Sequence, residues 1–135
     1  IKSYFNQRIN SMYTVIKRME VSAAHSLNLS YQSKCENLHG HNWIITVYCR
    51  AKELNADGMV VDFSHIKRAV KEKLDHRNIN EVLPFNPTAE NMAAHLAEVV
   101  APEALKGAGV TVVRCTVEET RKCSATWSLT QYVRQ

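Results

Sequence analysis

The sequence predicts an α+β fold, in which an antiparallel sheet of four strands carries two helices on one face. Segments rich in β-branched and aromatic residues, with apolar side chains at alternating positions, occur toward both ends of the chain. Between them lie two segments whose apolar residues recur at helical spacing. The expected order is β-β-α-α-β-β, and strand pairs that flank a helical pair are typical of a sheet covered on one side by helices.

Four segments carry the strand pattern. The clearest is NWIITVYCRA, which begins at Asn42 and alternates apolar with polar side chains. A turn is expected at residues 53–58 (ELNADG), followed by a short extended piece at 59–61, and two glycines near residue 108 break the chain before the third strand. The expected strands are residues 13–24, 42–51, 110–117 and 125–133.

The first helix is expected over residues 64–74, and either Asp62 or Ser64 can cap its N-terminus. Its apolar stripe consists of Ile66, Val70 and Leu74.

The second helix is expected to begin after Pro87, with Thr88 as its N-cap and Glu90 in the first turn, where the helix dipole favours an anion. Its expected buried face consists of Met92, Leu96, Val99 and Val100.

The composition indicates one globular domain over residues 1–135, in which residues 1–11 before Met12 form a possible N-terminal extension. A hydrophobic fraction of 45% and a charged fraction of 22% argue against disorder. The net charge of +4 suits an anionic small molecule, and without a basic run it argues against nucleic acid. No apolar stretch is long enough to span a membrane and no signal peptide is visible, so a cytoplasmic location is expected.

Three histidines form the sharpest chemical feature. In His39-Gly40-His41 the two imidazoles are two residues apart, so on an extended segment they point to the same face. His25 ends the preceding strand and could face them across an antiparallel ladder. Three neutral imidazoles with one open position are typical of a catalytic zinc site. The alternative is that such histidines are ordinary surface or hydrogen-bonded residues.

Other reactive side chains accompany these histidines. Their presence argues against the alternative that the histidines are ordinary surface or hydrogen-bonded residues. Cys35 lies just upstream of His39, Asp75-His76 follows the first expected helix, and Glu119 ends the third expected strand. The chain therefore combines candidate metal ligands with a thiol, a carboxylate–imidazole pair and a second carboxylate. The other three cysteines, Cys49, Cys115 and Cys123, form no CxxC pair and are expected to be reduced thiols.

Six short blocks resemble, in the same order, those of the 6-pyruvoyl-tetrahydropterin synthase family, which includes the 6-carboxy-tetrahydropterin synthases of queuosine biosynthesis. The blocks are AAH (23–25), CxxxHGH (35–41), VVDF (60–63), LDHRNIN (74–80), NPTAEN (86–91) and EET (118–120). The resemblance implies the tunnelling fold (T-fold), whose subunits associate into barrels. It also implies a homo-oligomer, a hexamer built as a dimer of trimers, with active sites between subunits.

The resemblance implies a role for each residue of these blocks that carries reactive chemistry. Zinc would be the cofactor and a pterin triphosphate the small-molecule partner. Glu119 would anchor the pterin ring by accepting hydrogen bonds from its amino-pyrimidine edge, a pairing that is strong and orienting. Thr88 would lie beside the pterin pocket. The implied zinc ligands are His25, His39 and His41, and the implied catalytic groups are Cys35, Asp75 and His76.

The spacing around the thiol separates the branches of the family. Three residues between Cys35 and His39 resemble the carboxy-tetrahydropterin branch, whereas the 6-pyruvoyl enzymes typically have five. The expected activity is a carbon–carbon lyase that converts 7,8-dihydroneopterin triphosphate to 6-carboxy-5,6,7,8-tetrahydropterin. Glu36, three positions before His39, resembles a further branch that makes 6-hydroxymethyl-7,8-dihydropterin for folate. A bifunctional enzyme, a solvated Glu36, a 6-pyruvoyl activity and a non-catalytic pterin-binding protein remain alternatives.

Overall fold

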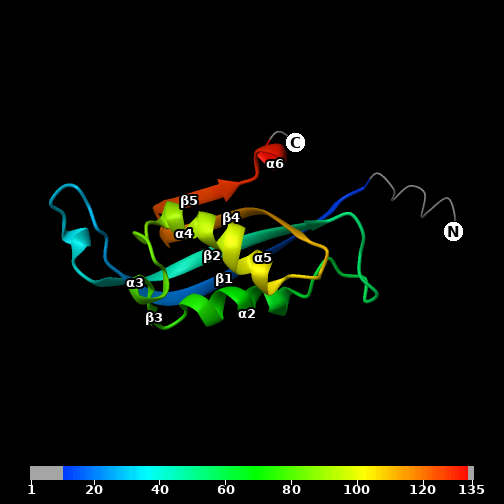
Figure 1. Ribbon diagram of the computed structural model, residues 1–135, viewed down its shortest axis with the longest axis horizontal. Coiled ribbons are helices and arrows are strands. Elements are labelled where there is room, and N and C mark those ends of the chain that lie inside the picture. The colour runs from blue at the N-terminus through cyan, green and yellow to red at the C-terminus, as the bar shows by residue number, and fades with distance from the viewer. Residues whose placement is uncertain (1–10, 134–135) are drawn as a thin grey trace, which may run out of the picture.

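The structure of the protein, a computed structural model, describes residues 11–133 and is built on one twisted sheet. Most of the expected N-terminal extension, residues 1–10, lies outside the described residues. The sheet has the strand order β3-β1-β2-β4-β5 (Figure 1), and all its neighbours are antiparallel except β3 and β1. The strands are β1 (Tyr13–His25), β2 (His39–Ala51), β3 (Arg77–Asn78), β4 (Thr111–Thr120) and β5 (Cys123–Ser128). The expected α+β class and the four antiparallel strands are confirmed, and β3 is a two-residue addition at the edge.

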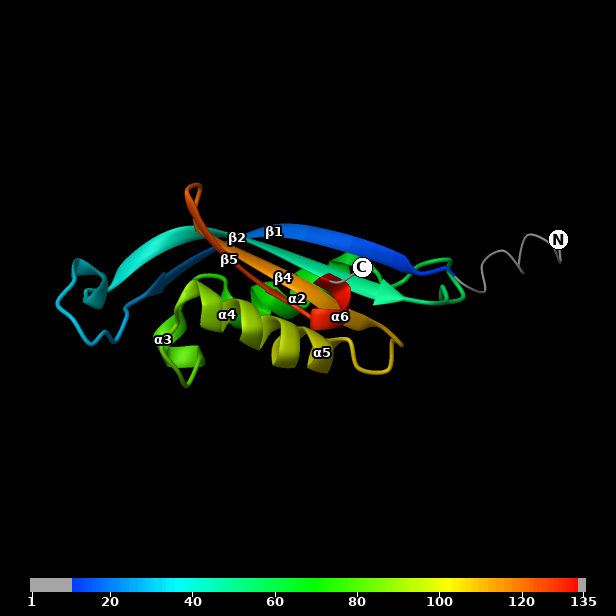
Figure 2. The same ribbon diagram turned by 90° about the horizontal axis from the view of Figure 1, so that it is seen from above.

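The main helices lie on one face of this sheet (Figure 2). Helix α2 packs on β1, and α4 packs on β4 and β5. Within residues 11–133 no helix is both long and apolar enough to cross a membrane. The helical elements are η1 (Lys34–Glu36), α2 (Phe63–Leu74), α3 (Ile79–Val82), α4 (Ala89–His95), η2 (Leu96–Val100), α5 (Ala101–Ala104) and α6 (Thr130–Val133).

The core lies between the helices and one face of the sheet. Side chains alternate along each strand, so β1 turns Val21 inward while β2 turns Trp43 and Ile45 inward, each at most 1% exposed. The stripe that was expected on the first helix is confirmed, because Ile66, Val70 and Leu74 are fully buried. Of the two possible caps, Asp62 is the N-cap of α2 and accepts a hydrogen bond from the backbone N–H of Ser64.

The second expected helix begins as predicted, but its buried face differs. Thr88 is the N-cap of α4, and Met92 and Leu96 are buried. Val99 is 45% exposed, against expectation, because η2 is a π-helix. Its wider turn brings the backbone N–H of Ala101 to the carbonyl of Leu96, and Ala101 takes the buried position instead.

Two other expectations at the ends of strands are wrong. The last strand was expected to run to residue 133, but β5 ends at Ser128 and Thr130–Val133 forms the short helix α6. The extended piece expected at residues 59–61 forms no strand. Val60 and Val61 are buried there without a strand partner, so their apolar character reflects burial in the core and not a β-strand.

Replacing Ile66 by Ala should lower the free energy of unfolding by about 2–5 kcal/mol, because it leaves a cavity under α2 where the side chain is fully buried. Lys67→Ala, one residue further along the same helix but exposed, should change it by less than about 0.5 kcal/mol. Urea unfolding of both variants at one fixed protein concentration measures the difference. Equal effects of the two substitutions would contradict the assigned core.

Candidate metal and substrate site

Three imidazoles meet at one end of the β1–β2 ladder. The register pairs His25 with His39 and Ala23 with His41, so all three histidines lie on the same face of the sheet as Trp43. The ring centroid of His25 lies 4.6 Å from that of His39 and 5.2 Å from that of His41. The centroids of His39 and His41 are 4.9 Å apart. The structure therefore brings the three predicted ligands together from two neighbouring strands.

Backbone carbonyls fix the proton position on two of these rings. The Nδ1–H of His25 donates to the carbonyl of Pro87 at 2.8 Å, and the Nδ1–H of His39 donates to the carbonyl of Asn37 at 2.7 Å. Since a carbonyl oxygen can only accept, each ring carries its proton on Nδ1 and keeps a lone pair on Nε2. Metal-binding histidines are oriented by this kind of outer hydrogen bond.

A carboxylate completes the cluster. Oε1 of Glu119 lies 2.9 Å from Nε2 of His41 and 3.6 Å from Nε2 of His25. One donor atom from each of these three residues and from His39 all lie within 4.8 Å of one another. The family resemblance implies a role for Glu119 toward the pterin, but nothing in the sequence placed it against the imidazoles. Its position two residues after buried Val117 was the signal that it faces the same side of the sheet.

The chemistry of these four side chains fits a divalent transition metal. Nε2 of His25 and Nε2 of His41 are buried and make no hydrogen bond, although Glu119 lies close to both. Burial lowers the pKa of His25 below its ordinary value, and the neighbouring His39 and His41 act in the same direction against opposing contributions from Pro87 and Glu119. His25 is therefore held as a neutral ligand with its lone pair directed into the cluster.

Asparagine side chains fasten the chain just beyond His25. Asn80 accepts a hydrogen bond from the N–H of Ser26 and donates to the carbonyl of the same residue. Asn86 makes the same pair of hydrogen bonds with Asn28. Both asparagines belong to sequence blocks on which the resemblance rests, and both hold the end of β1 in place.

Thr88 lies next to Pro87, whose carbonyl holds His25. Its hydroxyl accepts a hydrogen bond from the N–H of Asn91 as the cap of α4. The predicted position of Thr88 close to the site is therefore compatible with the structure, but in the chain as described its hydroxyl serves the helix.

Cys35 lies on η1, in the loop that projects beyond the end of the sheet between β1 and β2 (Figures 1 and 2). It is half-buried, whereas Glu36 on the same turn is exposed. Its sulfur is not a member of the four-residue cluster. Burial raises the pKa of Cys49 to about 11 and that of Cys115 to about 12, so these two core thiols stay protonated.

Asp75 and His76 are fixed to β1 through a single residue, Ser22. The backbone N–H of Ser22 donates to Oδ1 of Asp75 at 3.0 Å, and the N–H of His76 donates to the carbonyl of Ser22 at 2.7 Å. The first of these bonds lowers the pKa of Asp75 below its ordinary value. His76 has a φ of 57°, a left-handed conformation that is uncommon outside glycine. Its Nε2 lies 3.8 Å from Oδ2 of Asp75, and its side chain is 82% exposed.

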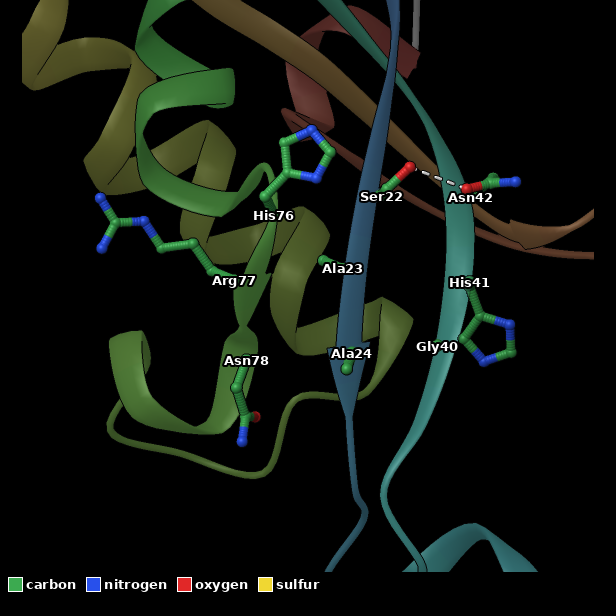
Figure 3. Close-up of a pocket in the computed structure, with 9 residues that line it drawn as sticks. All are labelled: Ser22, Ala23, Ala24, Gly40, His41, Asn42, His76, Arg77 and Asn78. Carbon is green, nitrogen blue, oxygen red and sulfur yellow. Dashed lines mark hydrogen bonds between the residues drawn. The ribbon is translucent and has the colours of Figure 1, made fainter.

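His76 lines a cleft of about 510 Å³ together with His41 of the imidazole cluster and with Ser22 and Asn42. Figure 3 shows His76 on one side of β1, and beyond β1 the hydrogen bond from Ser22 to Asn42. Ser22 and Asn42 alternate with the inward-facing residues of β1 and β2, whereas His41 belongs to the inward-facing set of β2 and lines the same cleft. Within the described part of one chain, Asp75 and His76 are not members of the four-residue cluster, although His76 and His41 line one cleft.

The chain is similar in sequence to known proteins of one family. The sequence model for "6-pyruvoyl tetrahydropterin synthase" matches residues 14–129. A 6-carboxy-5,6,7,8-tetrahydropterin synthase of Rickettsia bellii is 32% identical over 135 residues, covering 83% of this chain and 97% of that protein. A protein of the same name from Rickettsia felis is 29% identical with the same coverage.

Solved structures give the same result. The 6-pyruvoyl tetrahydropterin synthase of Caenorhabditis elegans superposes with a TM-score of 0.72 at 27% identity, covering 89% of this chain and 97% of that one. The synthase of Plasmodium vivax, at 18% identity, shares the fold with a TM-score of 0.67 and covers 87% of this chain and 98% of that one. The chain therefore belongs to the 6-pyruvoyl tetrahydropterin synthase family, a family of enzymes that act on pterins.

Proposed function

We propose that the protein is a zinc-dependent carbon–carbon lyase that converts 7,8-dihydroneopterin triphosphate to 6-carboxy-5,6,7,8-tetrahydropterin in queuosine biosynthesis. The observation that carries the proposal is the convergence of His25, His39 and His41 beside the carboxylate of Glu119. Support for the product comes from the Rickettsia relatives, which are named for it, and from the three-residue spacing between Cys35 and His39. Its substrate would be a small molecule in the cytoplasm, with neither nucleic acid nor membrane as a partner.

The three imidazoles would hold the zinc ion. Bound there, zinc would act as a Lewis acid that polarises the side-chain hydroxyls of the substrate. His25 is suited to this role because burial keeps its imidazole neutral. His39 is suited to it because its Nδ1–H donates to the carbonyl of Asn37, which leaves Nε2 for the metal.

Glu119 would bind the pterin ring. Its side chain is 27% exposed, so one carboxylate can face the imidazoles and still be reached from outside. A carboxylate suits the amino-pyrimidine edge because two parallel hydrogen bonds fix the plane of the ring. Thr88, next to Pro87, would line the same pocket.

Cys35 would move protons as a thiolate. An ordinary thiol with a pKa near 8.5 is only about 3% ionised at pH 7. A cationic imidazole beside the sulfur favours the thiolate, at about 1.4 kcal/mol for each pKa unit. His76 is the proposed imidazole, and Asp75 would orient it and stabilise its charge.

The proposed imidazole would come from a second copy of the chain. In one chain the His76 side chain is 82% exposed, and the cleft that it lines includes His41 but not Cys35. Among residues 11–133, the outer edge of β1 is paired only at Ala23 and Ala24, by β3, so the rest of that edge is open to a second copy. We therefore favour a homo-oligomer, a hexamer built as a dimer of trimers, with each active site between subunits.

Replacing Cys35 by Ala should lower turnover of 7,8-dihydroneopterin triphosphate by about 10²–10⁴-fold, the usual contribution of a positioned acid–base group. Bound zinc should be unchanged, because the sulfur lies outside the imidazole cluster. Product formation by mass spectrometry and metal analysis of the same samples test both statements. Cys123→Ala is the matched control, since that thiol is exposed and has no proposed role. Full turnover by Cys35→Ala would remove the thiol from the reaction.

Glu36 supports a second activity, formation of 6-hydroxymethyl-7,8-dihydropterin from the same substrate. It lies on the same 3₁₀ turn as Cys35 and is exposed, so both side chains can reach one substrate. Glu36→Ala should abolish the hydroxymethyl product and preserve the carboxyl product and its acetaldehyde partner. Glu53→Ala, which removes another exposed loop carboxylate, should change neither. An unchanged yield of the hydroxymethyl product would show that Glu36 is a solvated carboxylate.

Two inactive variants should restore activity when they are mixed. If Cys35 and His76 of one site come from different subunits, oligomers formed from Cys35→Ala and His76→Asn chains contain some intact sites, roughly a quarter when subunits pair at random. Asn is chosen at position 76 because it tolerates the left-handed backbone. The measurement is turnover after co-refolding, with each variant refolded alone as the control. No recovery in verified mixed oligomers would place both groups in the same chain.

A further inference from the structure

We infer that Glu119 is the fourth protein ligand of the metal when no substrate is bound, and that a pterin ring draws it off the metal. The inference rests on the proposed function for the three imidazole ligands and for the pterin ring. It adds a resting state in which the site is closed by the same carboxylate that later holds the substrate.

The spacing of the donor atoms supports a four-ligand site. In a tetrahedral zinc site with bonds of about 2.0–2.1 Å, any two donor atoms lie about 3.3 Å apart. The distances from Oε1 of Glu119 to Nε2 of His41 and of His25 are 2.9 Å and 3.6 Å, one on each side of that value. One oxygen atom therefore lies where a fourth ligand belongs relative to both nitrogens.

The hydrogen bonding of the histidines supports the same assignment. Glu119 is close to His41, yet Nε2 of His41 makes no hydrogen bond, and neither does Nε2 of His25. At His25, whose proton is on Nδ1, the Nε2 lone pair and the carboxylate oxygen repel one another unless a cation lies between them. An anionic ligand also offsets the charge of a divalent ion that three neutral imidazoles leave uncompensated.

The backbone at Glu119 permits the carboxylate to change partners. The β2–β4 register ends at Glu118, and the β4–β5 register passes from Glu118 to Thr120, so Glu119 occupies the irregularity in the ladder. Residues at such irregularities are aimed differently from their neighbours, and they recur near active sites. Glu118, one residue earlier, points to the other face and lies 4.0 Å from Arg18.

The consequence is a coupling between substrate recognition and metal access. In the resting protein the carboxylate fills the position that a substrate hydroxyl would need. The amino-pyrimidine edge of a pterin offers N–H donors, which a carboxylate binds as a charge-assisted pair. Binding of the ring therefore opens the metal site only for a ligand with that edge.

The test uses the full chain, stripped of metal and reloaded with Zn²⁺ or Co²⁺, and compares wild type with Glu119→Gln. The amide keeps the shape of the side chain and removes its charge. Zinc affinity, measured by competition with a chelating dye, should fall at least tenfold, since even outer-shell changes cost about 10–100-fold. The visible ligand-field band of bound Co²⁺ should also change. Glu118→Gln, on the other face, should alter neither reading, and circular dichroism verifies that both variants are folded.

A second arm adds 6-methyl-7,8-dihydropterin, which has the pterin ring but neither side-chain hydroxyls nor a triphosphate. Wild type loaded with Co²⁺ should then shift its band toward that of Glu119→Gln, whereas the variant should respond little. Equal zinc affinity and equal Co²⁺ spectra for wild type and Glu119→Gln would overturn the inference and leave the proposed three-histidine site intact. Failure of wild type to bind either ion would instead overturn the proposed function.

Discussion

The functional site depends on one backbone constraint, the register that pairs His25 with His39 across the β1–β2 ladder. Because side chains alternate along a strand, a slip of one residue would turn His25 toward the open face and separate it from the other two imidazoles. The same register buries Val21, Trp43 and Ile45. Core packing and metal geometry are therefore specified together, since the apolar residues that stabilise the sheet also set the positions of the histidines.

Several polar residues near the site act mainly on the backbone. Asn80 and Asn86 hold Ser26 and Asn28 just after β1, and Pro87 sets the proton position on His25. Asp75 holds Ser22 of the same strand. The sequence blocks that look like catalytic motifs thus contain both the groups proposed for chemistry and the groups that place β1. A substitution in such a block can reduce activity through either effect, and metal binding and stability separate the two.

Sequence patterns predicted the parts of this molecule that local periodicity determines. Alternation identified the four long strands, and helical spacing identified α2 with its buried Ile66, Val70 and Leu74. The three imidazoles were also predictable, because two alternate on one strand and the third ends its neighbour. The π-helix at residues 96–100 was not, since it changes the turn without any glycine or proline to mark it. Alternation after Val117 indicates the face on which Glu119 lies, but its contact with His41 depends on the pairing of strands far apart in the sequence. For the same reason the position of His76, outside the cluster but in a cleft that His41 also lines, was visible only in three dimensions.

The central claim is that His25, His39 and His41 bind one zinc ion together, and X-ray absorption at the zinc edge tests it most directly. The account predicts one ion per chain, surrounded by nitrogen and oxygen at about 2.0–2.1 Å with the outer scattering of imidazole rings. His25→Ala should lose that signal, and His65→Ala, on the exposed side of α2, should keep it. A shell of sulfur at about 2.3 Å, or an unchanged spectrum in His25→Ala, would contradict the claim.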